Sequence, residues 1–209
     1  NEVNDGYQMI PFYIICDESQ SMEGAKLDAC NTALPKIHAA IAADPIVNDK
    51  VRIGVISFSD TAEALLPLSK MTDVVDFPGL VVKGGTNYGN AFTCLKNTIQ
   101  TDIADLKKGG AKVNRPIVFF ISDGEPTDTN WKAAHAQVAD KSWPFSPHII
   151  SFGLSGAQAD TIREVATQVD KKGKSFAYLA DDDASGAVLR EIFNSLLSPI
   201  LRDECLEGR

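Results

Sequence analysis

The fold is decided by the stretch Ile10-Pro11-Phe12-Tyr13-Ile14-Ile15-Cys16-Asp17-Glu18-Ser19-Gln20-Ser21. Its apolar first part predicts a buried strand, and a helical pattern begins a few residues after its end. Between strand and helix, a carboxylate and two hydroxyls stand at alternate positions, on Asp17, Ser19 and Ser21. Such side chains can converge on one point, and oxygen ligands suit Mg²⁺, Mn²⁺ or Ca²⁺ better than Zn²⁺. The same residues are also ordinary helix caps, so this stretch alone leaves both interpretations open.

Two later segments supply oxygen ligands at equivalent places. Gly84 and Gly85 form a glycine-rich turn that brings Thr86 to the start of another helical stretch. A strand of the buried type, expected over 117–122, is followed at once by Asp123. In open α/β sheets, ligands bind beyond the carboxyl ends of the strands, so we expect these loops to share one site. The predicted metal ligands are Asp17, Ser19, Ser21, Thr86 and Asp123.

In this order, the predicted ligands resemble the metal-ion-dependent adhesion site of the von Willebrand factor type A (VWA) family. The family pattern is Asp-x-Ser-x-Ser, a distant Thr, and a later Asp at the end of a central strand. The resemblance covers residues 8–201 and implies a protein-interaction module in which a partner's carboxylate takes an open position on the metal. Segments 123–128, 84–87 and 56–59 look most like the bacterial intracellular TerY-like branch of tellurite-resistance operons. That likeness implies a role in metal or stress response.

The chain departs from the family pattern at Gln20, because glycine usually stands between the two serines. Glycine permits a tight loop there, so Gln20 could crowd the loop or turn its amide toward the site. Other polar residues that follow the ligands closely in sequence could contact the water shell of the metal: Asn87, Glu125 and Asp128. A role for each of them as a solvated loop residue or as a cap stays open.

Strand-like and helical segments alternate along the chain. This pattern predicts an α/β fold of the Rossmann-like kind, with a doubly wound, mostly parallel central sheet and helices on both faces. We expect strands over 8–16, 51–58, 117–122, 148–154 and 176–179. A further strand at 62–66 follows a very short turn and should pair antiparallel at the edge of the sheet. We expect helices over 25–42, 91–106, 131–141, 157–169 and 184–201.

Composition narrows the range of partners. The 209 residues are 44% hydrophobic and 23% charged, which fits one domain over residues 1–209 with a core over 8–201. The net charge of −8 disfavours nucleic acid and anionic membrane. No apolar stretch approaches the roughly 20 residues of a bilayer span, no segment reads as a signal peptide, and the cysteines lack metal-ligand spacing. We therefore expect a cytoplasmic protein, and we expect it to be a monomer.

The sequence favours a binding module over an enzyme. It places no obvious general base, nucleophile or phosphate cradle beside the predicted ligands. One alternative is a metal-dependent hydrolase or phosphatase, in which Asp17 or Asp123 activates a metal-bound water. A second alternative is a structural subunit in which the metal only braces three loops.

The last helix carries a predicted apolar stripe. Val188, Ile192, Leu196 and Ile200 recur every four residues and should lie against the sheet. The resemblance implies that this helix shifts when a partner ligand takes the open position on the metal.

Overall fold

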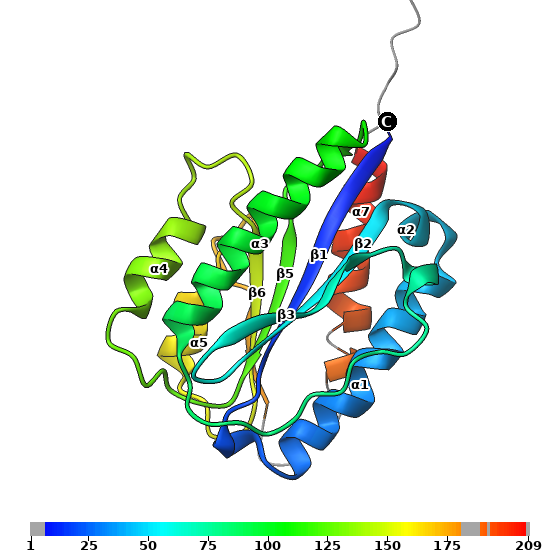
Figure 1. The fold of residues 1–209 in the computed structure, drawn as a ribbon. Helices are drawn as coiled ribbons and strands as arrows, with labels where there is room; N and C mark the ends of the chain where they lie inside the picture. The colour runs from blue at the N-terminus through cyan, green and yellow to red at the C-terminus, as the bar shows by residue number, and fades with distance from the viewer. Residues whose placement is uncertain (1–6, 181–188, 192, 208–209) are drawn as a thin grey trace, which may run out of the picture.

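The structure is a computed structural model that describes residues 7–180, 189–191 and 193–207. Within these residues one sheet has the strand order β3-β2-β1-β5-β6-β7, and the short β4 pairs with β1 (Figure 1). The strands are β1 (Gln8–Asp17), β2 (Val51–Phe58), β3 (Ala62–Ser69), β4 (Lys112–Val113), β5 (Ile117–Ser122), β6 (His148–Gly153) and β7 (Ala177–Leu179). Neighbouring strands are parallel except for β2 and β3, which pair antiparallel at one edge. The predicted fold class is confirmed.

Helices fill most of the connections between the strands. They are α1 (Ala25–Ala43), α2 (Pro45–Lys50), α3 (Tyr88–Lys108), α4 (Trp131–Val138), α5 (Ala159–Val165) and α7 (Ser198–Glu207). Short 3₁₀ segments are η1 (Gln20–Met22) and η2 (Met71–Asp73). In the described part of the chain, none of the helices combines the length and the apolarity that a bilayer crossing requires.

Alternate side chains of β1 serve two cores. Phe12 and Ile14 belong to the core shared with α1 and α7, whereas Tyr13 and Ile15 belong to the core shared with α3 and α4. Figure 1 shows α1 and α7 on one side of the sheet and α3 and α4 on the other. Successive side chains of a strand point to opposite faces, so a strand that is apolar throughout requires cover on both faces. β1 meets that requirement.

An aromatic cluster fixes the start of α3 against the sheet. Its members are Phe58, Tyr88, Phe92, Phe120 and Trp131. The Tyr88 ring lies edge-on to Phe120 with centroids 5.2 Å apart, and edge-on to Trp131 at 5.5 Å. Such pairs add to the gain from apolar burial. Because Tyr88 is the first residue of α3, the cluster also positions the loop that precedes it.

Two helices are shorter than their periodicity predicts. α4 ends early, at Val138, and α5 spans Ala159–Val165 rather than 157–169. After α5, the Thr167 N–H donates to the Ile149 carbonyl at 3.0 Å. This tertiary hydrogen bond takes a backbone donor that a further helical turn would need, and the helix ends before it.

The last helix differs from the expected 184–201. Residues 181–188 and 192 lie outside the described residues, so the predicted start is not part of the description. A π-helical segment, η3 (Phe193–Leu197), leads directly into α7, which continues to Glu207. The helix therefore extends beyond residue 201.

The buried stripe of this segment is displaced by one residue from the predicted one. Its buried side chains are Leu189, Phe193, Leu197, Leu201 and Cys205. Of the predicted stripe, Val188 and Ile192 lie outside the described residues, and Ile200 is only half-buried. Both sets keep a four-residue spacing, so periodicity alone gives two adjacent faces. Packing decides between them, because the Phe193 ring lies 6.5 Å from that of Phe12 in β1.

Candidate metal centre

Parallel strands bring the predicted ligands to one edge of the sheet. Asp17 is the last residue of β1, and Asp123 follows the last residue of β5. β1 and β5 are parallel neighbours, with Cys16 opposite Ile121, so their carboxyl ends lie side by side. Thr86 stands just before α3, whose start is held at the same edge by the aromatic cluster.

Hydrogen bonds and close approach bring these side chains into one group. The Ser19 and Ser21 hydroxyl oxygens lie 3.1 Å apart, and the Ser21 hydroxyl donates to Asp123 Oδ1 at 2.8 Å. A Cβ atom on Gly124 would lie 3.6 Å from Ser21 Oγ and 3.7 Å from Thr86 Oγ1. Hydroxyls from two different loops therefore face the same small space beside Asp123.

Asp17 is held from both sides. Its Oδ1 accepts the Ser19 N–H at 2.7 Å, and its Oδ2 accepts the Ser122 hydroxyl at 2.8 Å. The Tyr88 hydroxyl donates at 2.8 Å to Ser122 Oγ and lies equally close to the Gly124 carbonyl. A chain of hydrogen bonds thus runs from the aromatic cluster to the first predicted ligand.

Burial makes the negative charges of the two carboxylates costly unless they are compensated. Asp17 and Asp123 are 0% and 3% exposed, whereas Ser21 is exposed and forms the open side of the group. Burial raises the pKa of Asp17; hydrogen bonds from Ser19 and Ser122 oppose this rise, and the nearby Asp123 charge adds to it. Two carboxylates held close together out of water favour a bound cation.

The donor set fits a hard divalent cation. It contains two carboxylates and three hydroxyls, which matches the oxygen preference of Mg²⁺ and its tendency to keep several waters. Among the residues that the structure describes, no three His, Cys, Asp or Glu side chains gather into a metal-binding cluster. The fit therefore depends on Ser19, Ser21 and Thr86 and excludes the Cys and His ligands typical of structural zinc.

The remaining candidates near the site hydrogen-bond to other groups. Asp128 accepts the N–H groups of Tyr88 and Gly89 at 2.9 and 3.0 Å and so caps α3. Asn87 accepts the N–H of Asn90 at 2.8 Å, as its alternative reading as a cap predicts. These contacts give both residues a structural role at the start of α3.

Glu125 and Gln20 also have partners away from the predicted ligands. Glu125 Oε2 accepts the Thr161 hydroxyl at 2.7 Å. Gln20 is exposed and donates through Nε2 to Glu23 at 2.7 Å, while its backbone N–H donates to the Gly84 carbonyl at 2.9 Å. In this arrangement the Gln20 amide bonds along its own turn rather than to Asp17 or Asp123.

Three further residues support this site and were not predicted from the sequence: Glu18, Lys26 and Ser122. Glu18 is 1% exposed; its Oε2 accepts the Val81 N–H at 2.7 Å, and its Oε1 lies 3.5 Å from Lys83 Nζ. The carboxylate therefore ties the β1 loop to the loop before Thr86. Its signal was its place between the predicted ligands. Ser122 offered a similar signal, a hydroxyl at the end of an otherwise apolar strand.

Lys26 lies at the rim of the group. Its ammonium nitrogen is 2.6 Å from Asp123 Oδ2 and 3.5 Å from the Ser21 carbonyl oxygen. The Lys26 side chain is 30% exposed, whereas the Asp123 side chain is 0% exposed. One buried carboxylate is thus paired with an ammonium that reaches in from the surface.

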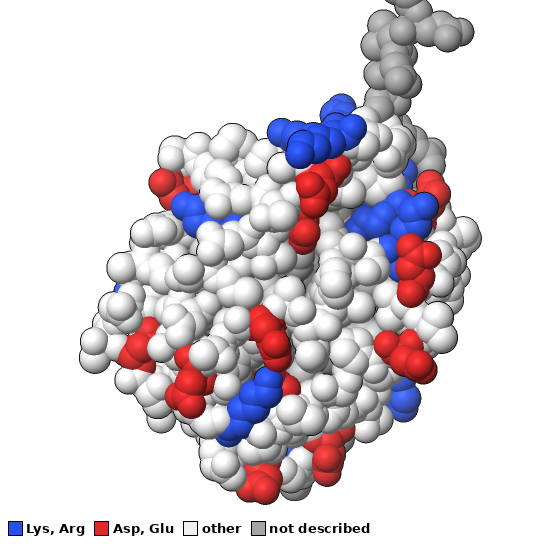
Figure 2. All heavy atoms as spheres, in the orientation of Figure 1, with Lys and Arg blue, Asp and Glu red and all other residues white. Residues whose placement is uncertain are grey.

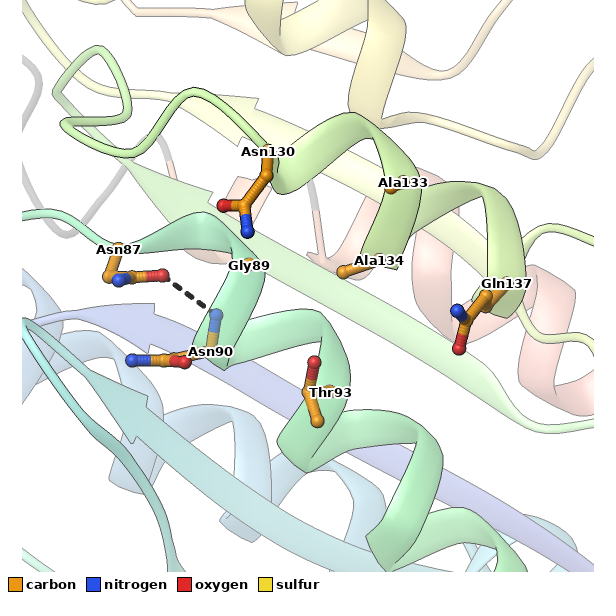
Figure 3. Close-up of a pocket in the computed structure, with 8 residues that line it drawn as sticks. All are labelled: Asn87, Gly89, Asn90, Thr93, Asn130, Ala133, Ala134 and Gln137. Atoms are coloured by element: carbon orange, nitrogen blue, oxygen red, sulfur yellow. Dashed lines mark hydrogen bonds between the residues drawn. The ribbon is translucent and has the colours of Figure 1, made fainter.

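A polar pocket lies between α3 and α4 (Figure 3). Its volume is about 300 Å³, and carboxamides line much of it. They belong to Asn87, Asn90, Asn130 and Gln137. The lining has no charged side chain, so the pocket offers hydrogen bonds without electrostatic attraction.

Solved structures share the fold at low sequence identity. The vWF domain of the type V pili tip protein Mfa5 from Porphyromonas gingivalis matches with a TM-score of 0.67 and 12% identity, over 93% of this chain and 95% of that one. A mutant of the PilB minor pilin from Streptococcus sanguinis matches with a TM-score of 0.68 and 12% identity, over 98% and 64% of the two chains. No curated protein sequence matches.

A third relative is proximal thread matrix protein 1 from the mussel byssus, solved with a zinc-occupied MIDAS motif. It matches with a TM-score of 0.60 and 13% identity, over 95% of this chain and 46% of that one. The chain thus spans about half the length of this relative. Residues 12–125 match the family model described as the von Willebrand factor type A domain. This match covers more than half of the sequence, and the chain belongs to the von Willebrand factor type A domain family.

Proposed function

We propose that the chain is a metal-dependent protein-interaction module that captures an acidic group of a partner protein. One observation carries the proposal: oxygen donors from three loops meet at the carboxyl edge of the sheet, with Asp17 and Asp123 buried and Ser21 exposed. These donors fit Mg²⁺, with Mn²⁺ or Ca²⁺ as alternatives. When bound, the ion supplies positive charge and a coordination position for a carboxylate from outside.

The residues of the chain orient the donors before any partner arrives. Ser19 and Ser122 fix both oxygens of Asp17, and Ser21 fixes one oxygen of Asp123. A site held by such supporting hydrogen bonds loses little conformational freedom on binding. The exposed side of the group at Ser21 is where a partner's carboxylate would approach.

We infer that the module performs no catalysis of its own. Histidine is the commonest general base, and two of the histidines of this chain lie within hydrogen-bonding distance of backbone carbonyls. His38 Nε2 lies 2.9 Å from the Met71 carbonyl oxygen, and His135 Nε2 lies 2.9 Å from that of Val165. Turnover of a phosphoester that disappears in Asp123→Asn would contradict this inference and favour a hydrolase.

The setting of the module is a further part of the proposal. The likeness of segments 84–87 and 123–128 to the TerY-like branch supports a bacterial metal or stress response in the cytoplasm. The structural relatives described above are pilus and byssus proteins, which supports interaction as the general task. The interaction role is the main part of the proposal, and the tellurite-resistance setting stays a prediction.

Calorimetric titration tests the metal site. MgCl₂ and MnCl₂ are titrated into the chelator-treated chain, its Asp123→Asn variant and its Glu125→Gln variant. We expect Asp123→Asn to weaken binding by at least about tenfold, the loss that even outer partners of a metal cause. Glu125→Gln removes the same charge two residues away, where the carboxylate bonds Thr161, and should change the affinity far less.

Partner capture is tested with defined probes. Immobilised peptides that present one aspartate are compared with their asparagine counterparts, in Mg²⁺ and in EDTA. Binding of the aspartate peptides in Mg²⁺ alone supports the proposal. In the calorimetric titration, equal affinity of the wild type and Asp123→Asn for Mg²⁺ and Mn²⁺ would contradict the proposed metal site.

A further inference from the structure

Lys26 reaches into the group of predicted ligands from the start of α1. Its ammonium lies 2.6 Å from Asp123 Oδ2, and the other oxygen of Asp123 accepts the Ser21 hydroxyl at 2.8 Å. Both oxygens of this buried carboxylate therefore have intramolecular donors. A buried charge is tolerated when it is paired and hydrogen-bonded in this way.

The lysine is also able to leave. Its side chain is 30% exposed, and its only other hydrogen bond from Nζ among the described residues is a long one, 3.5 Å, to the Ser21 carbonyl. An ammonium is a point charge on a flexible four-carbon stem, which can turn toward water without disturbing its helix. Asp123 is thus held in place, whereas the Lys26 side chain can turn away from it into solvent.

A divalent cation and the Lys26 ammonium need the same carboxylate. Two positive groups beside one buried oxygen pair repel each other strongly, because water screens them little there. We propose that Lys26 is an internal counterion: it neutralises Asp123 in the metal-free protein and must leave Oδ2 when a divalent cation binds. Lys26 then sets the metal concentration at which the site fills. This inference rests on the proposed metal site.

A simpler interpretation is an ion pair that only fastens α1 to the loop after β5. The two interpretations predict opposite changes in metal affinity when Lys26 is replaced. An ion pair that positions Asp123 helps metal binding, so its loss would weaken the affinity. A competing ammonium opposes metal binding, so its loss would strengthen the affinity.

The experiment compares lysines at the same edge of the sheet. Lys26→Met removes the competing charge and keeps most of the apolar stem. Lys83→Met is the matched control, because Lys83 pairs with Glu63 at 2.9 Å and Glu18 at 3.5 Å instead of with a predicted ligand. Titration of MgCl₂ and MnCl₂ into the chelator-treated full chain measures the affinity of each protein at one pH and ionic strength.

We expect Lys26→Met to bind Mg²⁺ at least about tenfold more tightly than the wild type. A neighbouring opposite charge changes the affinity of a carboxylate for a proton by about ten- to thousandfold, and a metal competes for the same oxygen. Lys83→Met should change the affinity by no more than about threefold, since its closer pair, with Glu63, is exposed and screened, and its longer contact, with Glu18, involves no predicted ligand. Lys26→Gln, which keeps a hydrogen-bond donor, should share the gain and serves if Lys26→Met does not fold.

Thermal unfolding gives a second readout. Metal-free Lys26→Met should unfold at a lower temperature than the wild type, because Asp123 loses its counter-charge, and saturating Mg²⁺ should remove the difference. Unchanged or weaker Mg²⁺ binding in both folded Lys26 variants, with a wild type that binds, overturns the counterion role alone. Absence of divalent binding in the wild type and in every variant overturns the metal site and the counterion role together.

Discussion

At the scale of single residues, Ser122 connects the candidate metal centre to the core. Its hydroxyl donates to Asp17 Oδ2 and accepts from the Tyr88 hydroxyl, each at 2.8 Å, and the side chain is fully buried. Tyr88 in turn packs within the aromatic cluster. The position of one buried hydroxyl thus couples the orientation of a predicted ligand to the packing of α3.

We predict that Ser122→Ala lowers Mg²⁺ affinity by about ten- to hundredfold, as the loss of an outer partner does. It should also reduce the free energy of unfolding by about 1–3 kcal/mol, because buried polar groups lose a partner. Calorimetry and urea unfolding measure the two effects. Ser151→Ala is the matched control: Ser151 is equally buried in β6, and its hydroxyl donates to the Ile162 carbonyl at 2.6 Å. Equal loss of affinity in both variants would refute the role of Ser122.

At the scale of elements, the central strands β1 and β5 were predictable because most of their residues are apolar on both faces. β1, β2 and β5 have the expected positions to within a residue, and the antiparallel edge strand β3 was expected from the short turn before it. The short helix α2 was missed, although its signal is present. Asp44 accepts the N–H groups of Ile46 and Val47, and Pro45 stands at the first helical position.

The places of Asp17 and Asp123 follow from the same strand ends, and these positions were enough to expect their convergence. The contact of Lys26 could not be expected. It depends on how α1 is tilted over the edge of the sheet, which no spacing in the sequence encodes. Likewise, the bonding of Asp128 to the start of α3 depends on how two loops pack together.

The last helix shows where periodicity fails. Pro199 near the start of α7 lacks the N–H that would bond the carbonyl four residues earlier, and the π-helical segment η3 precedes it. A π-helical turn rotates the residues that follow it relative to an unbroken α-helix. The buried face nevertheless keeps a four-residue spacing from Leu189, which precedes η3, to Cys205. Which of the two adjacent faces packs on the sheet is therefore decided by contacts such as that of Phe193 with Phe12.

We predict that Leu197→Ala costs about 2–5 kcal/mol of unfolding free energy, as the loss of a fully buried leucine does. Ile200→Ala, on the predicted but only half-buried face, should cost roughly 1 kcal/mol. Leu197 is 0% exposed, whereas Ile200 keeps contact with solvent. Urea unfolding of the two variants checks the assignment. A larger loss for Ile200→Ala would mean that the other face of the helix packs on the sheet.

At the scale of the whole molecule, the chain is acidic overall, and the face in Figure 2 carries charges of both signs. Acidic and basic side chains are interspersed on the face that Figure 2 shows, and the net charge of the sequence is −8. The surface in view therefore lacks the single basic patch of a nucleic-acid-binding protein. In an acidic protein, a divalent cation at the proposed site would reverse the sign of the local charge and would direct an acidic partner to the carboxyl edge of the sheet.

Acid stability is a property of the whole fold to which partly buried histidines contribute. Burial lowers the pKa of His135 from its ordinary value of 6.5, while its hydrogen bond to the Val165 carbonyl and the Glu164 charge oppose the shift. Burial, with the Arg115 charge, also lowers the pKa of His148. The unfolded chain therefore binds these protons at a higher pH than the folded protein does. The resulting stability is complete above about pH 6.5 and is lost as the pH falls toward the folded-state pKa values.

We predict that His135→Gln loses less unfolding free energy than the wild type as the pH falls. Glutamine keeps a donor for the Val165 carbonyl but takes up no proton, so the variant no longer pays the cost of charging a side chain packed 5.0 Å from the Phe92 ring. Urea unfolding of both proteins in EDTA at pH 7, 6 and 5 measures the effect. The stability of the wild type relative to the variant should fall with decreasing pH, by at most about 1.4 kcal/mol per pH unit for one proton. Carboxylates such as Asp17 titrate in both proteins and cancel in this difference, so a constant difference across the range would show that His135 takes up its proton equally in the folded and unfolded states.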